Sequence, residues 1–304
     1  MAINDKRLEV TEFDFDDVKD NLKTFLKAQD EFTDYDFEGS GMSVLLDVLS
    51  YNTHYLGFNA NMLANEMFLD SASLRSSIVS HAKTLGYVPS SARAAKATVD
   101  VTLNTTDSTA TMPAGTVFNT TVDDTTFQFS TIESFTKSNT GNSIPFVGVD
   151  IYEGTFITTR YTVDSSDIDQ RFLLTDNRAD TSTLIVKVQT SSTDSTSTTF
   201  TEATDITQVT SGSNVFFLQE VEAGLFEVYF GDGVIGTALS DDNIVILTYV
   251  VSNKTAANGA SLFTNAATIA SVTDVSVATA ATASAGSEPE SLSSIKYNAP
   301  LDFA

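Results

Sequence analysis

Apolar residues near the start of the chain recur every three or four positions, the spacing of one face of an α-helix. The first stripe covers residues 14–28 and has aspartates in its first turn, where the helix dipole favours negative charge. Its apolar members are Phe15, Val18, Leu22, Phe25 and Leu26. We therefore expect an amphipathic helix over 14–28.

Two more helices are expected before residue 92. One opens at Ser40 and is rich in leucine, methionine and asparagine. Because asparagine lowers helix propensity, we expect tertiary or intersubunit packing to stabilise it. The other follows Asp70 and Ser71 and ends at Gly86, a residue suited to a left-handed C-cap, with Pro89 just beyond. Residues 1–92 are thus predicted to form a helical domain.

After Ala97 the pattern changes to period two, with Val99, Val101 and Leu103 alternating with polar residues. Further strands are expected at 116–119, 127–131, 156–163, 171–174, 184–189, 215–218, 225–230 and 244–251. The predicted fold class is α+β: the helical domain followed by one or two mainly antiparallel β domains over 93–285. With two β domains, the division would fall near 150–180.

Two connections in the β-rich part have distinctive sequences. Met112-Pro113-Ala114-Gly115 places proline and glycine second and fourth, as a type I turn prefers. The run Thr190–Thr201 is low in complexity, and we expect a surface loop without a functional role.

Composition excludes several kinds of partner. The 304 residues carry a formal net charge of −24, which would repel nucleic acid and anionic membranes. The chain has no cysteine, which removes disulfides, thiolate metal sites and cysteine nucleophiles. No apolar run has the length of a signal peptide core or a bilayer span, so we expect neither an export address nor a membrane partner.

A glycine string matches a nucleotide-binding fingerprint in letters alone. Gly231, Gly233 and Gly236 lie in FGDGVIG, a literal GxGxxG. The fingerprint needs a helix after it, whereas only 237–242 separate it from the β-branched run that starts at Ile244. We expect the glycines to shape a hairpin between antiparallel strands by supplying positive φ.

Candidate metal sites in the sequence are weak. Asp34–Gly39 resembles the opening of an EF-hand loop, but the twelfth position, which should be glutamate, is Leu45. Asp164, Asp167 and Asp169 suit a solvated acidic turn better than a cation site. We therefore expect no metal ion and no cofactor.

Catalytic motifs are equally incomplete. Ser80 and Lys83 match an SxxK string without its companion strings. The histidines, His54 and His81, both fall in predicted helices, where a packed or hydrogen-bonded histidine is commoner than a catalytic one. No carboxylate pair stands out by spacing, so no catalytic residue, no small-molecule substrate and no enzymatic activity are expected.

Four strings in chain order resemble one known family. They are DSASLRSSIVSHAKTLGYVP at 70–89, MPAGTVF at 112–118, FGDGVIG at 230–236 and IKYNAPLDFA at 295–304. Together they resemble the baseplate-J-like wedge subunits of contractile-tailed, myovirus-type phages. The long helix after Ser40 is similar to the same family. In that family the glycine string is a loop and Pro113 with Gly115 forms a turn before a strand.

The resemblance implies a structural protein of the virion, located in the tail baseplate and made in the host cytoplasm. It implies a homo-oligomer, a dimer by expectation, that joins other wedge proteins around the central hub and changes conformation when the sheath contracts. Because family members continue well past Pro300, residues 286–304 are expected to be a linker into a C-terminal region absent from this chain.

A candidate interface lies on the helical arm, the long helix that opens at Ser40 and its continuation to Leu69. Met62, Met67, Phe68 and Leu69 either present apolar surface to a neighbour or form the arm's own core.

Two other functional classes stay open. A tail-tip adhesin or carbohydrate-binding β module agrees with the threonine-rich strands but not with the absence of tryptophan. A carboxylate-based hydrolase would lose turnover on replacement of one acidic residue.

Overall fold

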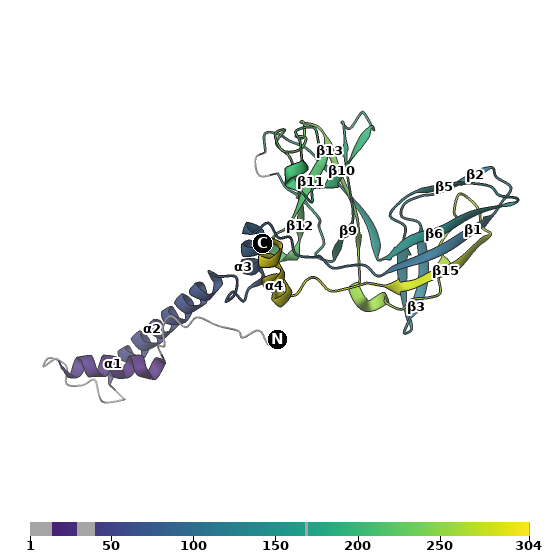
Figure 1. The fold of residues 1–304 in the computed structure, drawn as a ribbon. Helices are drawn as coiled ribbons and strands as arrows, with labels where there is room; N and C mark the ends of the chain where they lie inside the picture. Colours follow the sequence, from purple (N-terminus) through teal and green to yellow (C-terminus); the bar gives the residue numbers. More distant parts are fainter. Residues whose placement is uncertain (1–13, 29–39, 168–169, 304) are drawn as a thin grey trace. The chain divides into compact units, whose positions relative to one another are not determined.

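The computed structural model describes residues 14–28, 40–167 and 170–303. The chain up to Tyr87 and the segment from Leu292 onward form one compact unit, called the helical unit below. Val88–Ser291 forms a second compact unit, the β unit. The β unit is therefore inserted in the sequence between two parts of the helical unit (Figure 1).

The helical unit contains the predicted helices, with caps that the sequence explains. They are α1 (Phe15–Lys27), α2 (Gly41–Glu66) and α3 (Arg75–Thr84). Ser40 caps α2, its hydroxyl oxygen accepting a hydrogen bond from the Ser43 amide at 3.0 Å. Gly86 follows α3 with φ +83°, the left-handed conformation expected of a glycine C-cap.

The end of the chain differs from the expected linker. Residues 292–303 form α4 (Leu292–Phe303), whose buried Ile295 and Ala299 pack in a core with Ile78 and Ala82 of α3. The Lys296 ammonium donates to the Asp70 carbonyl at 2.9 Å. This segment is therefore helical and belongs to the core of the helical unit.

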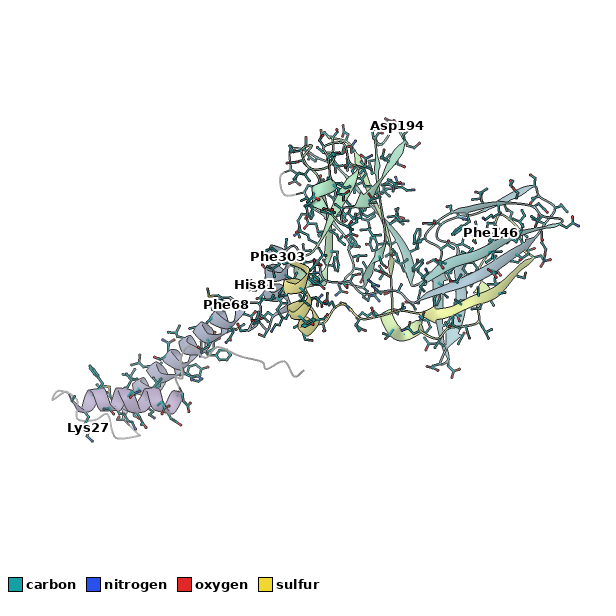
Figure 2. The ribbon with its side chains drawn as sticks, viewed as in Figure 1. Lys27, Phe68, His81, Phe146, Asp194 and Phe303 are labelled. Atoms are coloured by element: carbon teal, nitrogen blue, oxygen red, sulfur yellow. The ribbon has the colours of Figure 1, made fainter. Side chains whose placement is uncertain are left out.

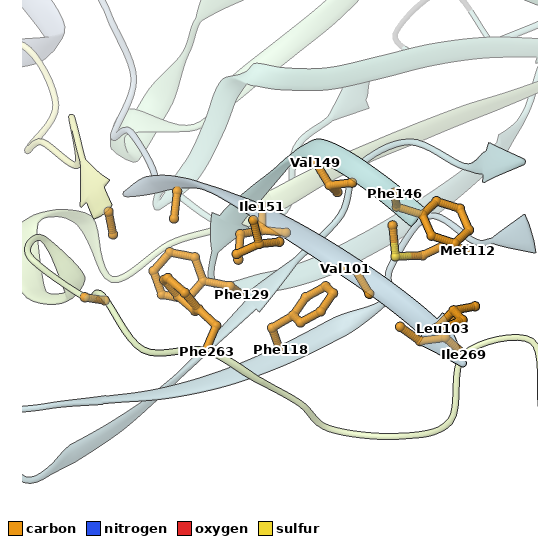
Figure 3. Close-up of a cluster of buried hydrophobic side chains, with 14 of the residues drawn as sticks. Val101, Leu103, Met112, Phe118, Phe129, Phe146, Val149, Ile151, Phe263 and Ile269 are labelled. Carbon is orange, nitrogen blue, oxygen red and sulfur yellow. The ribbon is translucent and has the colours of Figure 1, made fainter. Parts of the chain in front are cut away.

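One sheet of the β unit has the strand order β14-β3-β4-β6-β1-β15, with every neighbouring pair antiparallel. Its strands are β1 (Lys96–Asn104), β3 (Val117–Val122), β4 (Thr125–Ser130), β6 (Ser143–Glu153), β14 (Thr264–Asn265) and β15 (Val275–Ser284). A separate ribbon joins β2 (Thr109–Met112) to β5 (Phe135–Ser138). Phe118, Phe129 and Phe263 lie in the apolar core of this part, and the rings of Phe129 and Phe263 meet edge to face (Figure 3).

The other sheet has the order β7-β13-β9-β10-β11-β12-β8. Its strands are β7 (Thr155–Thr162), β8 (Phe172–Leu173), β9 (Ala179–Gln189), β10 (Ser197–Glu202), β11 (Val215–Glu220), β12 (Phe226–Phe230) and β13 (Ile244–Val251). Among these neighbours only β10 and β11 run parallel. A second apolar core lies on this sheet and contains the fully buried Tyr249. The observed architecture confirms the predicted α+β class.

Hydrogen bonds join segments of the two sheets inside the β unit. The buried Asp180 carboxylate of β9 accepts from the buried Ala94 amide at 2.8 Å, just before β1. The buried Glu153 carboxylate, at the end of β6, accepts from the Asn253 amide at 2.8 Å and side chain at 2.7 Å. Burial is the main influence on Glu153 and raises its pKa, although both hydrogen bonds act in the opposite direction.

The two ends of the β unit lie side by side. The amides of Arg93 and Ser287 each donate to the other's carbonyl, at 3.0 and 3.1 Å. The Glu290 amide donates to the Ser90 carbonyl at 2.9 Å, and the Ser90 amide donates to the Glu290 carboxylate at 3.1 Å. The chain therefore enters and leaves the β unit through a short antiparallel pairing.

Two local predictions for the β unit are wrong. The Thr116 amide donates to the Pro113 carbonyl, so proline is first in the turn and Gly115 third, with φ +80°. A positive φ at the third position is typical of a type II turn, not of type I. Residues 197–201 of the expected loop belong to β10, because Phe200 is buried in the core and the strand pairs with β9.

Candidate interaction surface

The residues on the side of α2 that meets α1 are mostly small and polar. Asp47 forms an ion pair with Lys19 of α1, which fixes the side that meets α1. The buried residues of α2 are Ser43, Leu46 and Ser50, and they lie on that side at helical spacing from Asp47. This face buries a single large apolar residue, Leu46, so intrachain packing accounts for little of the apolar content of α2.

Another side of α2, roughly 110° round the helix from the buried face, carries an aromatic row. Its members follow one another at alternating spacings of four and three residues, the heptad spacing of helices that pack on other helices. They are Val44, Val48, Tyr51, Tyr55, Phe58 and Met62, each between 44% and 64% exposed. The rings of Tyr51 and Tyr55 stack with centroids 6.3 Å apart.

A leucine row runs beside the aromatic row, one residue later and so about 100° further round the helix. It repeats the same spacing with Leu45, Leu49, Asn52, Leu56, Asn59 and Leu63. The four leucines are between 52% and 69% exposed. The two rows together are called the α2 surface below. This arrangement reverses the usual amphipathic helix, in which the apolar face meets the core and the polar face meets water.

The α2 surface carries no formal charge. Between Asp47 and Glu66 the sequence has no aspartate, glutamate, lysine or arginine. Charge depletion combined with tyrosine, phenylalanine and methionine is the composition of the centre of a protein–protein interface.

The predicted interface residues separate into two groups. Met62, Met67 and Phe68 are exposed, and Met62 ends the aromatic row. Leu69 instead packs against the core that α3 forms with α4. Figure 2 shows Phe68 just beyond the C-terminal end of α2. The alternation of four and three was the sequence signal that could have identified the rest of the surface.

Glu66 holds the junction of α2 with α3. Its carboxylate accepts from the Ser73 amide at 2.8 Å, the Ser73 hydroxyl at 2.7 Å and the Leu74 amide at 3.3 Å. Leu74 is the N-cap position of α3 and has no side-chain cap of its own. Burial alone would raise the pKa of Glu66, but hydrogen bonds from Ser77, Ser73 and Leu74 outweigh it and lower the pKa to about 2. The His81 ring nitrogen lies 2.9 Å from the Glu66 carbonyl oxygen.

The glycine string forms a tight loop and not the expected hairpin. β12 pairs with β11 and β8, whereas β13 pairs with β7 and β9, so the strands on either side of the loop are not neighbours. Gly233 and Gly236 have φ +88° and +80°, which glycine adopts without strain. Gly231 serves close approach instead, because a Cβ there would overlap the Ile235 carbonyl oxygen.

The loop after β12 has no helix on which a pyrophosphate could rest. The Asp232 carboxylate accepts from the amides of Val234 and Ile235 at 2.9 and 3.0 Å, and these bonds lower its pKa. The Gly236 amide donates to the Thr210 carbonyl at 3.1 Å. The Asp232 carboxylate and the Thr210 carbonyl thus occupy donors that a phosphate would need.

The remaining motifs do not assemble into a site among the described residues. Asp34–Gly39 and Asp169 lie outside the described residues. The Asp164 carboxylate accepts from the Ser166 hydroxyl and amide, which lower its pKa. Ser80 and Lys83 are exposed on α3. Over 14–28, 40–167 and 170–303, no three acidic or histidine side chains group closely enough to hold a metal ion.

The described helices share a further property. None of them combines the length and the apolar content that crossing a membrane requires.

The helical unit contains a segment that matches a known protein family. Residues 14–87 match the family described as "Baseplate wedge protein gp6-like, helical domain". Over 285 residues the chain is 28% identical to "Baseplate wedge protein gp6" of Enterobacteria phage T4, an alignment that covers 86% of this chain. The chain spans 42% of the length of that relative. The resemblance to phage baseplate wedge subunits is thereby confirmed.

Proposed function

We propose that this protein is a structural subunit of a phage tail baseplate and that the α2 surface binds neighbouring subunits there. The observation that supports this most is the exposure of two apolar rows on α2, within the segment that matches the gp6-like helical domain. The similarity to the T4 wedge protein extends beyond this segment into the β unit and supports the same role.

The physical argument is the cost of leaving the α2 surface in water. Burial of one large apolar side chain contributes about 1.5–3 kcal/mol, and ten such side chains form the two rows. An apolar surface of this extent on a single helix marks an interaction site. Binding to neighbouring subunits would remove it from water and would stabilise α2, which contains weak helix formers such as Asn52 and Asn59.

We further propose how the α2 surface and the division into two units serve assembly and contraction. The α2 surface would link one wedge to the next around the central hub, with the protein present as a dimer. The change of baseplate conformation on sheath contraction would occur between compact units and not within their cores. The division of the chain into a helical unit and a β unit supports this view.

The test compares phage particles assembled with one of two variants. Each variant replaces one exposed apolar side chain by lysine. Tyr55→Lys places a charge in the aromatic row, and Leu262→Lys places one on a β-unit side chain that is 81% exposed. Antibody labelling and electron microscopy would locate each variant before and after sheath contraction. We expect label on the baseplate for the Leu262 variant and a strong loss of it for the Tyr55 variant, with both purified variants folded by circular dichroism.

Three outcomes would count against the proposal. Label on distal fibres would favour an adhesin. Absence of the wild-type protein from particles would remove the structural role altogether. Normal incorporation of the Tyr55 variant would show that the α2 surface is not used for assembly.

A further inference from the structure

We propose that Asn258 is a latent site of spontaneous deamidation, which the folded β unit keeps unreactive by holding its side chain on the backbone of Gly286. Asn258 follows the short 3₁₀-helix η3 (Lys254–Ala257), and Gly286 follows β15. Neither residue belongs to the α2 surface, so this inference stands or fails independently of the proposed function.

The sequence places the two reacting groups next to each other. In deamidation, the backbone nitrogen of the following residue attacks the side-chain amide carbon of asparagine and forms a carbon–nitrogen bond. The displaced NH2 group takes up the nitrogen's proton and leaves as ammonia. Water then opens the five-membered succinimide ring at either carbonyl and gives aspartate or isoaspartate. A following glycine favours the attack because it has no Cβ to crowd the ring, and Asn258-Gly259 is the one asparagine–glycine pair in the sequence.

Two hydrogen bonds hold the side chain that would be attacked. The Asn258 amide nitrogen donates to the Gly286 carbonyl at 3.0 Å, and the Asn258 side-chain oxygen accepts from the Gly286 amide at 3.0 Å. This approach requires a glycine, because a Cβ at position 286 would overlap the Lys254 carbonyl oxygen and crowd the Asn258 oxygen. The amide carbon of Asn258 is therefore held on Gly286 and cannot turn freely toward Gly259.

The attacking nitrogen is also occupied. The Gly259 amide donates to the Ala283 carbonyl of β15 at 2.7 Å, and the Ala283 amide donates to the Ala260 carbonyl at 2.8 Å. The backbone of Asn258 is extended, with ψ 138°, which turns the Gly259 nitrogen out of the plane of the ring that would form. Asn258 is itself exposed to water. The protection is therefore conformational, and ring closure requires a local opening that breaks these hydrogen bonds.

Reaction at Asn258 would leave a lasting change. Aspartate has no proton near neutral pH to donate to the Gly286 carbonyl, and isoaspartate adds a carbon to the backbone before Gly259. Either product weakens the contacts of this turn with β15 and the residue after it. Gly286 is followed by Ser287, which pairs with Arg93 at the ends of the β unit. Opening of this region would thus be recorded chemically beside that pairing.

The experiment measures the rate of deamidation in the full-length chain. A synthetic peptide with the sequence of residues 255–262 gives the unhindered rate in the same solution. Mass spectrometry of tryptic peptides, with chromatography to separate isoaspartate, follows both in buffer and in urea at one mildly alkaline pH. We expect Asn258 to react at least about tenfold more slowly in the folded chain than in the peptide, and at the peptide's rate in urea, because only open states react.

A matched pair of variants tests the role of Gly286. Gly286→Ala displaces the Asn258 side chain, whereas Gly212→Ala meets no atom within 4 Å. With both variants folded by circular dichroism, the first should deamidate faster at Asn258 and the second at the wild-type rate. Hydrogen exchange of the Gly259 amide in the wild type tests the gate without a substitution. Its protection should match the slowing of deamidation, because both reactions need the same nitrogen released.

Three results would overturn the proposal. Equal rates for Asn258 in the folded chain and in the peptide would show that the fold gives no protection. Absence of reaction in urea would show that Asn258 is not a reactive site. A folded Gly286 variant that deamidates at the wild-type rate would remove Gly286 from the mechanism. None of these results would alter the proposed role in the baseplate.

Discussion

The strand β1 and the helix α2 treat their apolar side chains in opposite ways. β1 alternates regularly, with Ala97, Val99, Val101 and Leu103 all buried against the core of its own sheet. On α2 most of the larger apolar side chains lie outside, and the buried residues are Ser43, Leu46 and Ser50. The β unit therefore buries its hydrophobic pattern within one chain, whereas α2 leaves most of its large apolar side chains exposed on the single chain.

The largest expected effect contrasts two phenylalanines. Phe118→Ala removes a fully buried ring from the β unit and should lower the free energy of unfolding by about 3–5 kcal/mol. Phe58→Ala removes a ring that is 60% exposed and should change it by less than about 1 kcal/mol in the isolated chain. Urea denaturation at low protein concentration measures both.

Protein concentration sharpens this test. If α2 is buried in an assembly, the cost of Phe58→Ala should grow as concentration rises, because association then adds to stability. The cost of Phe118→Ala should not depend on concentration in this way. Equal costs for the two changes in dilute solution would show that α2 is not open to solvent, and the comparison would fail.

The second prediction tests how tightly the backbone of the β unit packs. Gly231→Ala forces a Cβ onto the Ile235 carbonyl and should destabilise by about 1–3 kcal/mol, the cost of overpacking. Gly212→Ala meets no atom within 4 Å and needs no positive φ. Gly212→Ala should leave the Tm of thermal unfolding unchanged or raise it slightly. A similar fall in Tm for both variants would contradict the close approach.

The third prediction concerns polar groups inside the β unit. Asp180→Ala leaves the buried Ala94 amide without its acceptor and should cost about 1–3 kcal/mol. Asp150→Ala breaks an exposed ion pair with Lys96 and should cost less than about 1 kcal/mol. Denaturant unfolding of the two variants gives the comparison. Equal losses would mean that Asp180 is not a structural tie between the sheets.

The smallest effect is expected inside the helical unit. Glu66→Gln removes the charged cap of α3 and should cost about 1 kcal/mol at pH 7. The folded pKa lies below the ordinary value of 4.5, so this stabilisation is full above that pH and is lost as the pH falls toward about 2. Helical circular dichroism during unfolding should show the gap between wild type and variant closing over that range. A constant gap would exclude the carboxylate as its source.

Local signals predicted most of the regular elements. Ser40 before α2, Gly86 after α3 and the alternation of β1 each act within a few residues, so the sequence alone carries them. β6 was not predicted because it contains Pro145 and Gly148, residues that disfavour strands. In the structure, Gly148 has φ +69° and accompanies a register shift against β1, which is a bulge.

The candidate surface was predicted only at its C-terminal end. Apolar residues occur on several sides of α2, so periodicity alone could not decide which side meets the chain itself. That choice depends on the long-range pairing of Asp47 with Lys19. β12 and β13 follow one another in the chain, and nothing in the sequence indicated that three other strands separate them in the sheet.

The short pairing between the two ends of the β unit has a mechanical consequence. Arg93 with Ser287 and Ser90 with Glu290 are held by hydrogen bonds that cross from one end segment to the other. A pull that drew these ends apart would load the bonds one after another, as in a zipper, and not all at once. Under tension the β unit would therefore open first at the paired end segments 90–93 and 287–290, while both sheets kept their shape.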